Sequence, residues 1–130
     1  MKRSTKNAAG KLFAIGGILY GLLEILWRRH THWSMILTGG ICFTVLYRIL
    51  RQLTVCSLWL KCCIGSTVIT IIELLSGFLF NYCLKLQVWD YSRQRFNFCG
   101  QICAVYSLLW GLLMIPINAL CHWLYRRFGW

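Results

Sequence analysis

Apolar residues fill four long stretches of this chain, and polar or charged residues collect between them. The stretches run over about residues 12–27, 33–47, 62–84 and 102–124. A helix that crosses a bilayer needs about 20 residues, within a range of about 17–25. The third and fourth stretches have this length. The first and second reach it when Lys11, Arg28 and Arg48 extend their charged ends toward the membrane surface. The pattern therefore predicts an all-α fold, a polytopic membrane bundle of about four transmembrane helices.

Composition leads to the same prediction. The chain has 130 residues, of which 58% are hydrophobic and 13% are charged, and its mean hydropathy is +0.61. Soluble domains carry about a quarter of charged residues. A chain of this length forms one domain, so we expect a single integral membrane domain over residues 1–130.

Two segments are less regular than the rest. Residues 48–61 alternate basic and apolar residues, which predicts a cytoplasmic loop or a short helix at the membrane interface. Pro116 lies inside the fourth apolar stretch, where a proline is tolerated but should bend the helix.

The net charge of +11 comes from small basic clusters at the edges of the apolar stretches. This distribution suits contact with lipid phosphates, so we expect a membrane-lipid partner and no nucleic acid. With both termini in the cytoplasm, nine basic residues lie inside and five outside. The inner set is Lys2, Arg3, Lys6, Lys11, Arg48, Arg51, Lys61, Arg126 and Arg127, and the outer set is Arg28, Arg29, Lys85, Arg93 and Arg95. The bias predicts four spans with both termini inside.

The sequence lacks the motifs that indicate nucleotide binding, hydrolysis or metal binding. The segment AAGKL places Leu12 where a nucleotide-binding loop needs Ser or Thr, and Thr5 stands in place of its first glycine. There is no HExxH and no GxSxG. The eight cysteines include no CxxC pair, and His30 with His32 supplies only two metal ligands. We therefore expect no enzyme activity, no ATP site, no cofactor and no metal.

Two of the three acidic residues, Glu24 and Glu73, lie within apolar stretches. A carboxylate in the middle of a membrane helix costs about 2.5–3.5 kcal/mol on insertion scales, so its presence favours a function. For Glu73, near the centre of the third stretch, we favour the functional interpretation. Glu24 could equally form an i, i+4 pair with Arg28.

Helical spacing gathers polar and small residues on one face of each stretch. The faces are Ser66, Thr70, Glu73, Gly77 and Asn81 in the third stretch, Gly17, Gly21, Glu24 and Arg28 in the first, and Ser107, Gly111 and Asn118 in the fourth. Lipid cannot satisfy such faces, so we expect them to meet one another. The glycines would let helices pack closely, and Asn81, Ser107 and Asn118 would form hydrogen bonds between helices. We also expect Glu73 to approach Glu24 or a base such as Arg28.

The third acidic residue, Asp90, lies in a polar segment, VWDYSRQRFNFCGQIC, residues 88–103. Three of its rings suit the headgroup level of a membrane, and three polar side chains can hold its backbone. The rings are Trp89, Tyr91 and Phe96; Asp90 and Ser92 can accept backbone N–H groups, and Asn97 could cap the fourth helix. Two interpretations stay open. The segment is a rigid turn, or Asp90 with Arg93 or Arg95 lines the mouth of a polar crevice that ends at Glu73.

The same segment resembles the signature of a bacterial integral-membrane family described as Putative ABC-transporter type IV. Members carry W-D-Y-S, then F-N, then G-x-I-C, and a serine and a tryptophan in the next helix. The matching residues here are Trp89, Asp90, Tyr91, Ser92, Phe96, Asn97, Gly100, Ile102, Cys103, Ser107 and Trp110. Glu24 and Glu73 match two glutamates of the family. Arg95 stands where a proline commonly precedes the F-N pair.

Residues 19–35, LYGLLEILWRRHTHWSM, are similar to a firmicute subgroup of that family and include His32. The resemblance implies a multi-pass protein of the bacterial cytoplasmic membrane that serves as a small transporter or permease component. Its proton or cation groups would be Glu24 and Glu73, on a polar pathway that includes Asn81 and Asp90. Secondary candidates are Arg28, His32, Ser107 and Trp110.

Four helices enclose little space, so a homo-oligomer or another membrane subunit is expected. The alternative is a module without transport activity, which binds lipid or a membrane-protein partner in a regulatory or scaffold role.

Overall fold

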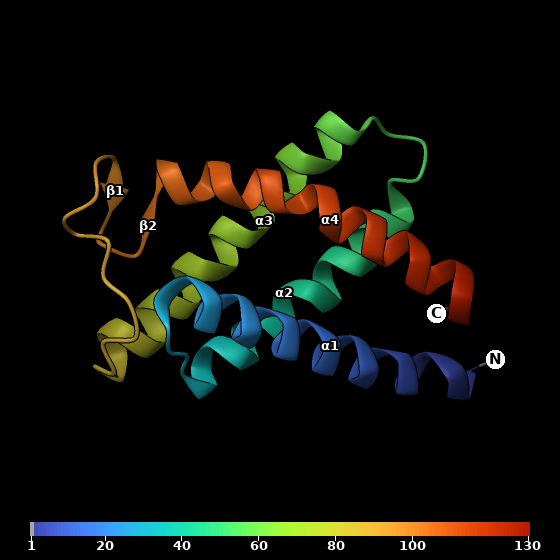
Figure 1. Cartoon of the computed structure of the whole chain (residues 1–130), viewed down its shortest axis with the longest axis horizontal. Coiled ribbons are helices and arrows are strands. Elements are labelled where there is room, and N and C mark those ends of the chain that lie inside the picture. The colour runs from blue at the N-terminus through green and yellow to red at the C-terminus, as the bar shows by residue number, and fades with distance from the viewer. Residues whose placement is uncertain (1) are drawn as a thin grey trace. The chain divides into compact units, whose positions relative to one another are not determined.

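The computed structural model describes residues 2–130, with side chains from Asn7 onward, and is mainly helical (Figure 1). Its elements are the helices α1 (Lys2–Arg28), α2 (Trp33–Gln52), α3 (Leu58–Gly77) and α4 (Ala104–Phe128), the π-helix η1 (Phe78–Cys83), and the strands β1 (Asn97–Phe98) and β2 (Ile102–Cys103). Four segments are long and apolar enough to cross a membrane: Asn7–Arg28, Trp33–Gln52, Leu58–Cys83 and Ala104–Phe128. The predicted fold class is confirmed. The side chains of Lys2, Arg3 and Lys6, which the charge count placed in the cytoplasm, lie outside the described residues.

The prediction of a separate loop or interfacial helix over residues 48–61 is wrong. α2 continues to Gln52 and α3 begins at Leu58, so only a short connection joins them. Basic residues near the end of α2 do not terminate it, because a positive charge is favourable at the C-terminus of a helix. Ser57 starts α3, since its hydroxyl accepts a hydrogen bond from the backbone N–H of Leu60 at 3.3 Å.

The chain divides into two compact units. We call the residues up to Thr54 together with Pro116–Trp130 the hairpin unit, and Val55–Ile115 the loop unit. The boundary in the last helix falls at Pro116, and α4 continues through this proline. The bend at Pro116 and the single domain over residues 1–130 stay predictions.

In the hairpin unit, α1 and α2 pack against each other through glycines (Figure 1). A Cβ on Gly17 would lie 2.9 Å from the carbonyl oxygen of Ile36, and one on Gly21 would lie 3.4 Å from the side chain of Ile36. The predicted role of Gly17 and Gly21 in helix packing is confirmed. Gly40 of α2 faces α1 in the same way, because a Cβ there would lie 2.8 Å from the carbonyl oxygen of Phe13.

Gly40→Ala should therefore destabilise the full chain by about 1–3 kcal/mol, since the backbone of α1 would have to move. The measurement is unfolding of the purified protein in a denaturing detergent. Gly10→Ala is the matched control, because nothing lies within 4 Å of a Cβ at Gly10 in α1. Alanine there should be neutral or stabilising by up to about 1 kcal/mol, since alanine is the better helix former. Equal losses in both variants would contradict the close packing of α1 on α2.

In the loop unit, a small antiparallel pair of strands precedes α4. Asn97 pairs with Cys103 and Phe98 with Ile102. The sequence predicted helix from residue 102 and no strand, so the start of the fourth helix is corrected to Ala104. The turn between the strands needs a left-handed backbone at Cys99 and Gly100, with φ of 54° and 70°. Gly100 adopts this conformation without strain, which explains a glycine at this point.

Candidate functional site

The predicted polar face of α3 lies against α4 within the loop unit. The hydroxyl of Ser66 donates to the backbone carbonyl of Ser107 at 2.6 Å, and the hydroxyls of Thr70 and Ser107 are 2.8 Å apart. Gly65 lets α4 approach, because a Cβ there would collide with Met114. The prediction that Ser107 forms hydrogen bonds between helices is confirmed.

Glu73 is the next residue along this face, and only 7% of it is exposed. The indole Nε1–H of Trp110, 37 residues away on α4, donates to Glu73 Oε2 at 2.6 Å. This short distance is typical of a hydrogen bond to an ionised acceptor. Sequence reasoning singled out Glu73 for its place in the membrane and Trp110 from the family pattern, and the structure brings the two together.

Tyr91 adds a second group from the signature segment. Burial raises the pKa of Tyr91 above its ordinary value, and the charge of Glu73 and a side-chain hydrogen bond to it raise that pKa further. The ring of Tyr91 stacks on Tyr106 of α4 with centroids 4.7 Å apart, and Tyr106 lies 6.2 Å from the ring of Trp110. Glu73 is therefore enclosed by aromatic side chains from α4 and from the segment before β1. Tyr91 remains a protonated donor at any ordinary pH.

Asn81, at the end of the same face, fastens the signature segment. Its amide Nδ2 donates to Gln101 Oε1 at 2.9 Å, and its Oδ1 accepts the backbone N–H of Val88 at 2.7 Å. The indole of Trp89 donates to the backbone carbonyl of Gln101 at 2.9 Å. Gly77 leaves room for this amide, because a Cβ there would lie 2.5 Å from Gln101 Oε1. Gln101 was missed by the sequence analysis, since it occupies the variable position of the G-x-I-C pattern.

Asp90 and Asn97 hold the turn itself. Asp90 Oδ1 accepts the backbone N–H of Ser92 at 2.8 Å, and hydrogen bonds from Ser92 lower the pKa of the exposed Asp90. Asn97 donates to the carbonyls of Ser92 and Gln94 and accepts the N–H of Gly100 at 3.1 Å. The prediction that Asn97 caps the fourth helix is wrong, because Asn97 belongs to β1 and α4 begins only at Ala104. The contacts support the rigid-turn interpretation.

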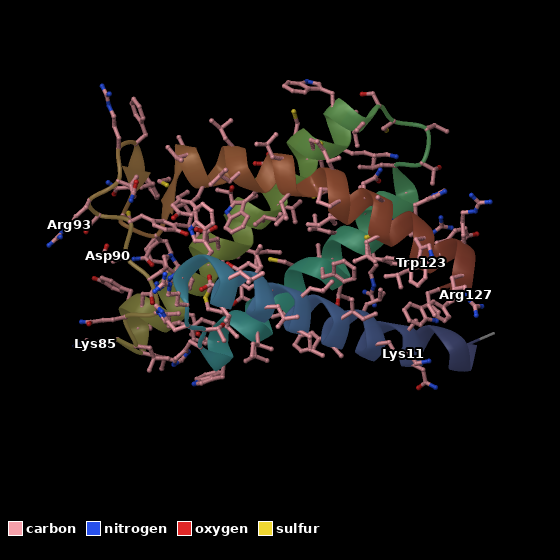
Figure 2. All side chains as sticks on the ribbon, viewed as in Figure 1. Lys11, Lys85, Asp90, Arg93, Trp123 and Arg127 are labelled. Carbon is pink, nitrogen blue, oxygen red and sulfur yellow. The ribbon has the colours of Figure 1, made fainter. Side chains whose placement is uncertain are left out.

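The aromatic residues of the segment differ in their surroundings. Trp89 and most of Tyr91 are buried within the loop unit, whereas Phe96 is 73% exposed. Phe96 and the neighbouring Phe98, which is also exposed, present their rings outward as interfacial residues would. Figure 2 shows Asp90 and Arg93 on the outer part of the segment. A crevice that begins at Asp90 stays a prediction.

In the hairpin unit, Glu24 has local partners. It accepts a hydrogen bond from the hydroxyl of Tyr20 at 3.2 Å and forms an ion pair with Arg28 at 3.4 Å, so the predicted i, i+4 pair is confirmed. His32 caps α2, since its Nδ1 accepts the backbone N–H of Ser34 at 3.2 Å.

The approach of Glu73 to Glu24 and the hydrogen bond of Asn118 stay predictions. Residues 2–130 contain no group of three metal-ligating side chains.

Four apolar helices and a buried carboxylate define a multi-pass membrane protein. A model of the family described as Putative ABC-transporter type IV matches residues 12–129. The chain belongs to this family. No curated protein and no solved structure matches it.

Proposed function

We propose that this chain is the membrane component of a transporter or permease and that Glu73 exchanges a proton or cation during its cycle. One observation carries the proposal: Glu73 is buried in α3 between the indole of Trp110 and the hydroxyl of Tyr91. A carboxylate at membrane depth is rarely retained without a use. The donors around it come from two different elements, so its charge influences how those elements pack.

The bond between Glu73 and Tyr91 offers a way to couple protonation to movement. A hydrogen bond to a charged group contributes about 1.5–3 kcal/mol, and one between neutral groups about 0.5–1.5 kcal/mol. When a proton binds the Glu73 carboxylate, the bonds from Trp110 and Tyr91 lose their ionic component. The signature segment is then held to α3 less firmly by about 1 kcal/mol, the difference for the bond from Tyr91, whereas the weaker bond from Trp110 loosens α4. Tyr91 would act as a lid that opens when Glu73 is neutral.

The energy source and partners belong to the same proposal. The sequence has no nucleotide-binding loop, so the chain would use an ion gradient or an ATPase carried by another subunit. A four-helix chain encloses little space, so the active form would be a homo-oligomer or a complex with another membrane subunit. The chain itself would be no enzyme, and the proposed location is the bacterial cytoplasmic membrane, as the family resemblance implies.

The test is proton flux into liposomes that contain the purified protein and a trapped pH-sensitive dye. Glu73→Gln keeps the shape and one acceptor oxygen but removes the charge, so it should abolish the pH dependence of the flux while the protein stays folded. Glu24→Gln is the matched control, because Glu24 is equally buried but pairs with Arg28 in its own helix. Loss of the pH dependence in Glu24→Gln but not in Glu73→Gln would contradict the assignment.

The second candidate is a scaffold without transport activity. The hydrogen bonds of Ser66 and Thr70 with Ser107, and of Asn81 with Gln101, favour it, because such pairing is what a packing surface between helices requires. In a scaffold, Glu73→Gln would leave any flux unchanged and Glu73→Ala would unfold the protein. That combination would replace the transporter proposal with the scaffold.

A further inference from the structure

One end of the hairpin unit gathers basic side chains from three helices. α1 contributes Lys11, the last turns of α2 contribute Arg48 and Arg51, and the last turn of α4 contributes Arg126 and Arg127. We call these five residues the basic end. Figure 2 shows Lys11 and Arg127 at the same end of the hairpin unit, with Trp123 close to Arg127.

Contacts with aromatic residues tie the basic end together. The ammonium of Lys11 lies 5.4 Å from the ring centroid of Trp130, and the hydroxyl of Tyr47 donates to the backbone carbonyl of Trp130 at 2.7 Å. The guanidinium carbon of Arg51 lies 3.1 Å from the ring centroid of Tyr125. Stacking occupies the flat face of a guanidinium and leaves the N–H groups at its edge able to donate. Arg51 is thus held in place with its donors still available.

The basic end has no acidic side chain as a counterpart within the described residues of the hairpin unit. The only side-chain carboxylate of the hairpin unit is Glu24, and Glu24 pairs with Arg28. Glu24 is also about 20 Å along α1 from Lys11, at about 1.5 Å per residue. None of the five basic residues forms an ion pair with a described side chain. Five like charges at one end of the unit repel one another, so a bound anion would stabilise them.

The surroundings of the basic end indicate which anion. Trp123 and Phe128 expose 55% and 49% of their surface, and Phe128 stacks on Trp130 with centroids 4.7 Å apart. Exposed aromatic rings at the end of an apolar helix are typical of the headgroup level of a membrane. The same level of the cytoplasmic leaflet holds anionic lipids, and all five basic residues belong to the set that the charge count places inside.

We propose that the basic end is a binding site for the phosphodiester group of an anionic phospholipid. Arg51 donates to the phosphate from its fixed guanidinium, and Lys11, Arg126 and Arg127 supply further positive charge. The site differs from general attraction to a charged surface, because it depends on particular side chains that three helices bring together.

The test is native mass spectrometry of the full chain in detergent, titrated with phosphatidylglycerol or with phosphatidylcholine of the same acyl chains. The wild type should bind phosphatidylglycerol at least about 25-fold more tightly, which corresponds to about two basic side chains at about fivefold each. Lys11→Gln with Arg51→Gln should weaken phosphatidylglycerol binding about 25-fold, at about fivefold for each basic residue. If that pair fails to fold, Arg126→Gln with Arg127→Gln changes only exposed positions and should give a loss of similar size.

Arg93→Gln with Arg95→Gln is the matched control, because it removes the same charge from exposed positions in the loop unit. This control should keep the wild-type affinity. An equal loss in the control, or equal binding of phosphatidylcholine by the wild type, would overturn the proposal. Displacement of the lipid by millimolar inorganic phosphate would overturn the assignment to a lipid. Unchanged affinity in both pairs at the basic end would also overturn it, and an acidic protein surface would then be the better counterpart.

Discussion

Trp110→Phe should destabilise the protein by about 3 kcal/mol, because it removes the indole N–H that donates to the buried Glu73 at 2.6 Å. Phenylalanine keeps an aromatic ring at this position but has no donor, and withdrawing a partner from a buried charged acceptor is costly. Unfolding in a denaturing detergent measures the loss. Trp59→Phe in α3 is the matched control, since Trp59 is 79% exposed and its replacement should change stability by less than about 0.5 kcal/mol.

A double variant separates the lost hydrogen bond from the lost ring volume. When apolar residues replace both Glu73 and Trp110, no buried carboxylate is left without its indole donor. Glu73→Leu with Trp110→Phe should therefore lose much less folding free energy than the sum of the two single changes. Strict additivity of the single losses would show that Glu73 and Trp110 do not interact as the structure has them.

The four long helices could be predicted because their presence follows from hydropathy alone. Apolar runs long enough to cross a bilayer can bury their backbone only as helices. The helix ends could not be predicted as well, since basic side chains such as Arg48 and Arg51 are compatible with both a helix end and a loop. The strand pair was missed because two-residue strands show no alternation of hydrophobic and polar residues.

The polar face of α3 could be predicted from helical periodicity, and every position on it from Ser66 to Asn81 lies against α4 or the signature segment. Its partners were harder to find. Tyr91 reaches Glu73 from an irregular segment, where no periodicity relates the two positions. The local pair of Glu24 with Arg28 could be predicted from the sequence, since residues four apart in a helix are neighbours.

We expect the signature segment to loosen as Glu73 gains a proton. Protonation weakens the bond from Tyr91, so backbone amides of the segment should become less protected as the pH falls. The N–H of Tyr91, which donates to the carbonyl of Gly100 at 2.8 Å, is one such amide. A loss of about 1 kcal/mol corresponds to about a fivefold fall in protection.

Other groups in the segment do not produce the same effect. Because hydrogen bonds from Ser92 lower the pKa of Asp90, any stability that Asp90 adds is present above its ordinary pKa and is lost only as the pH falls through the lowered value. The raised pKa of Tyr91 keeps its hydroxyl protonated throughout. A change in amide protection at a pH above the ordinary titration range of an aspartate therefore belongs to another group. Asp90→Asn should leave that change in place.

The most direct measurement is hydrogen exchange of residues 88–103 in the full chain, expressed as protection factors and followed over pH in the wild type and in Glu73→Gln. We expect a fall of about fivefold with decreasing pH in the wild type and low, pH-independent protection in Glu73→Gln. The same pH-dependent fall in both proteins, or constant protection in the wild type, would contradict the claim that Glu73 controls the signature segment.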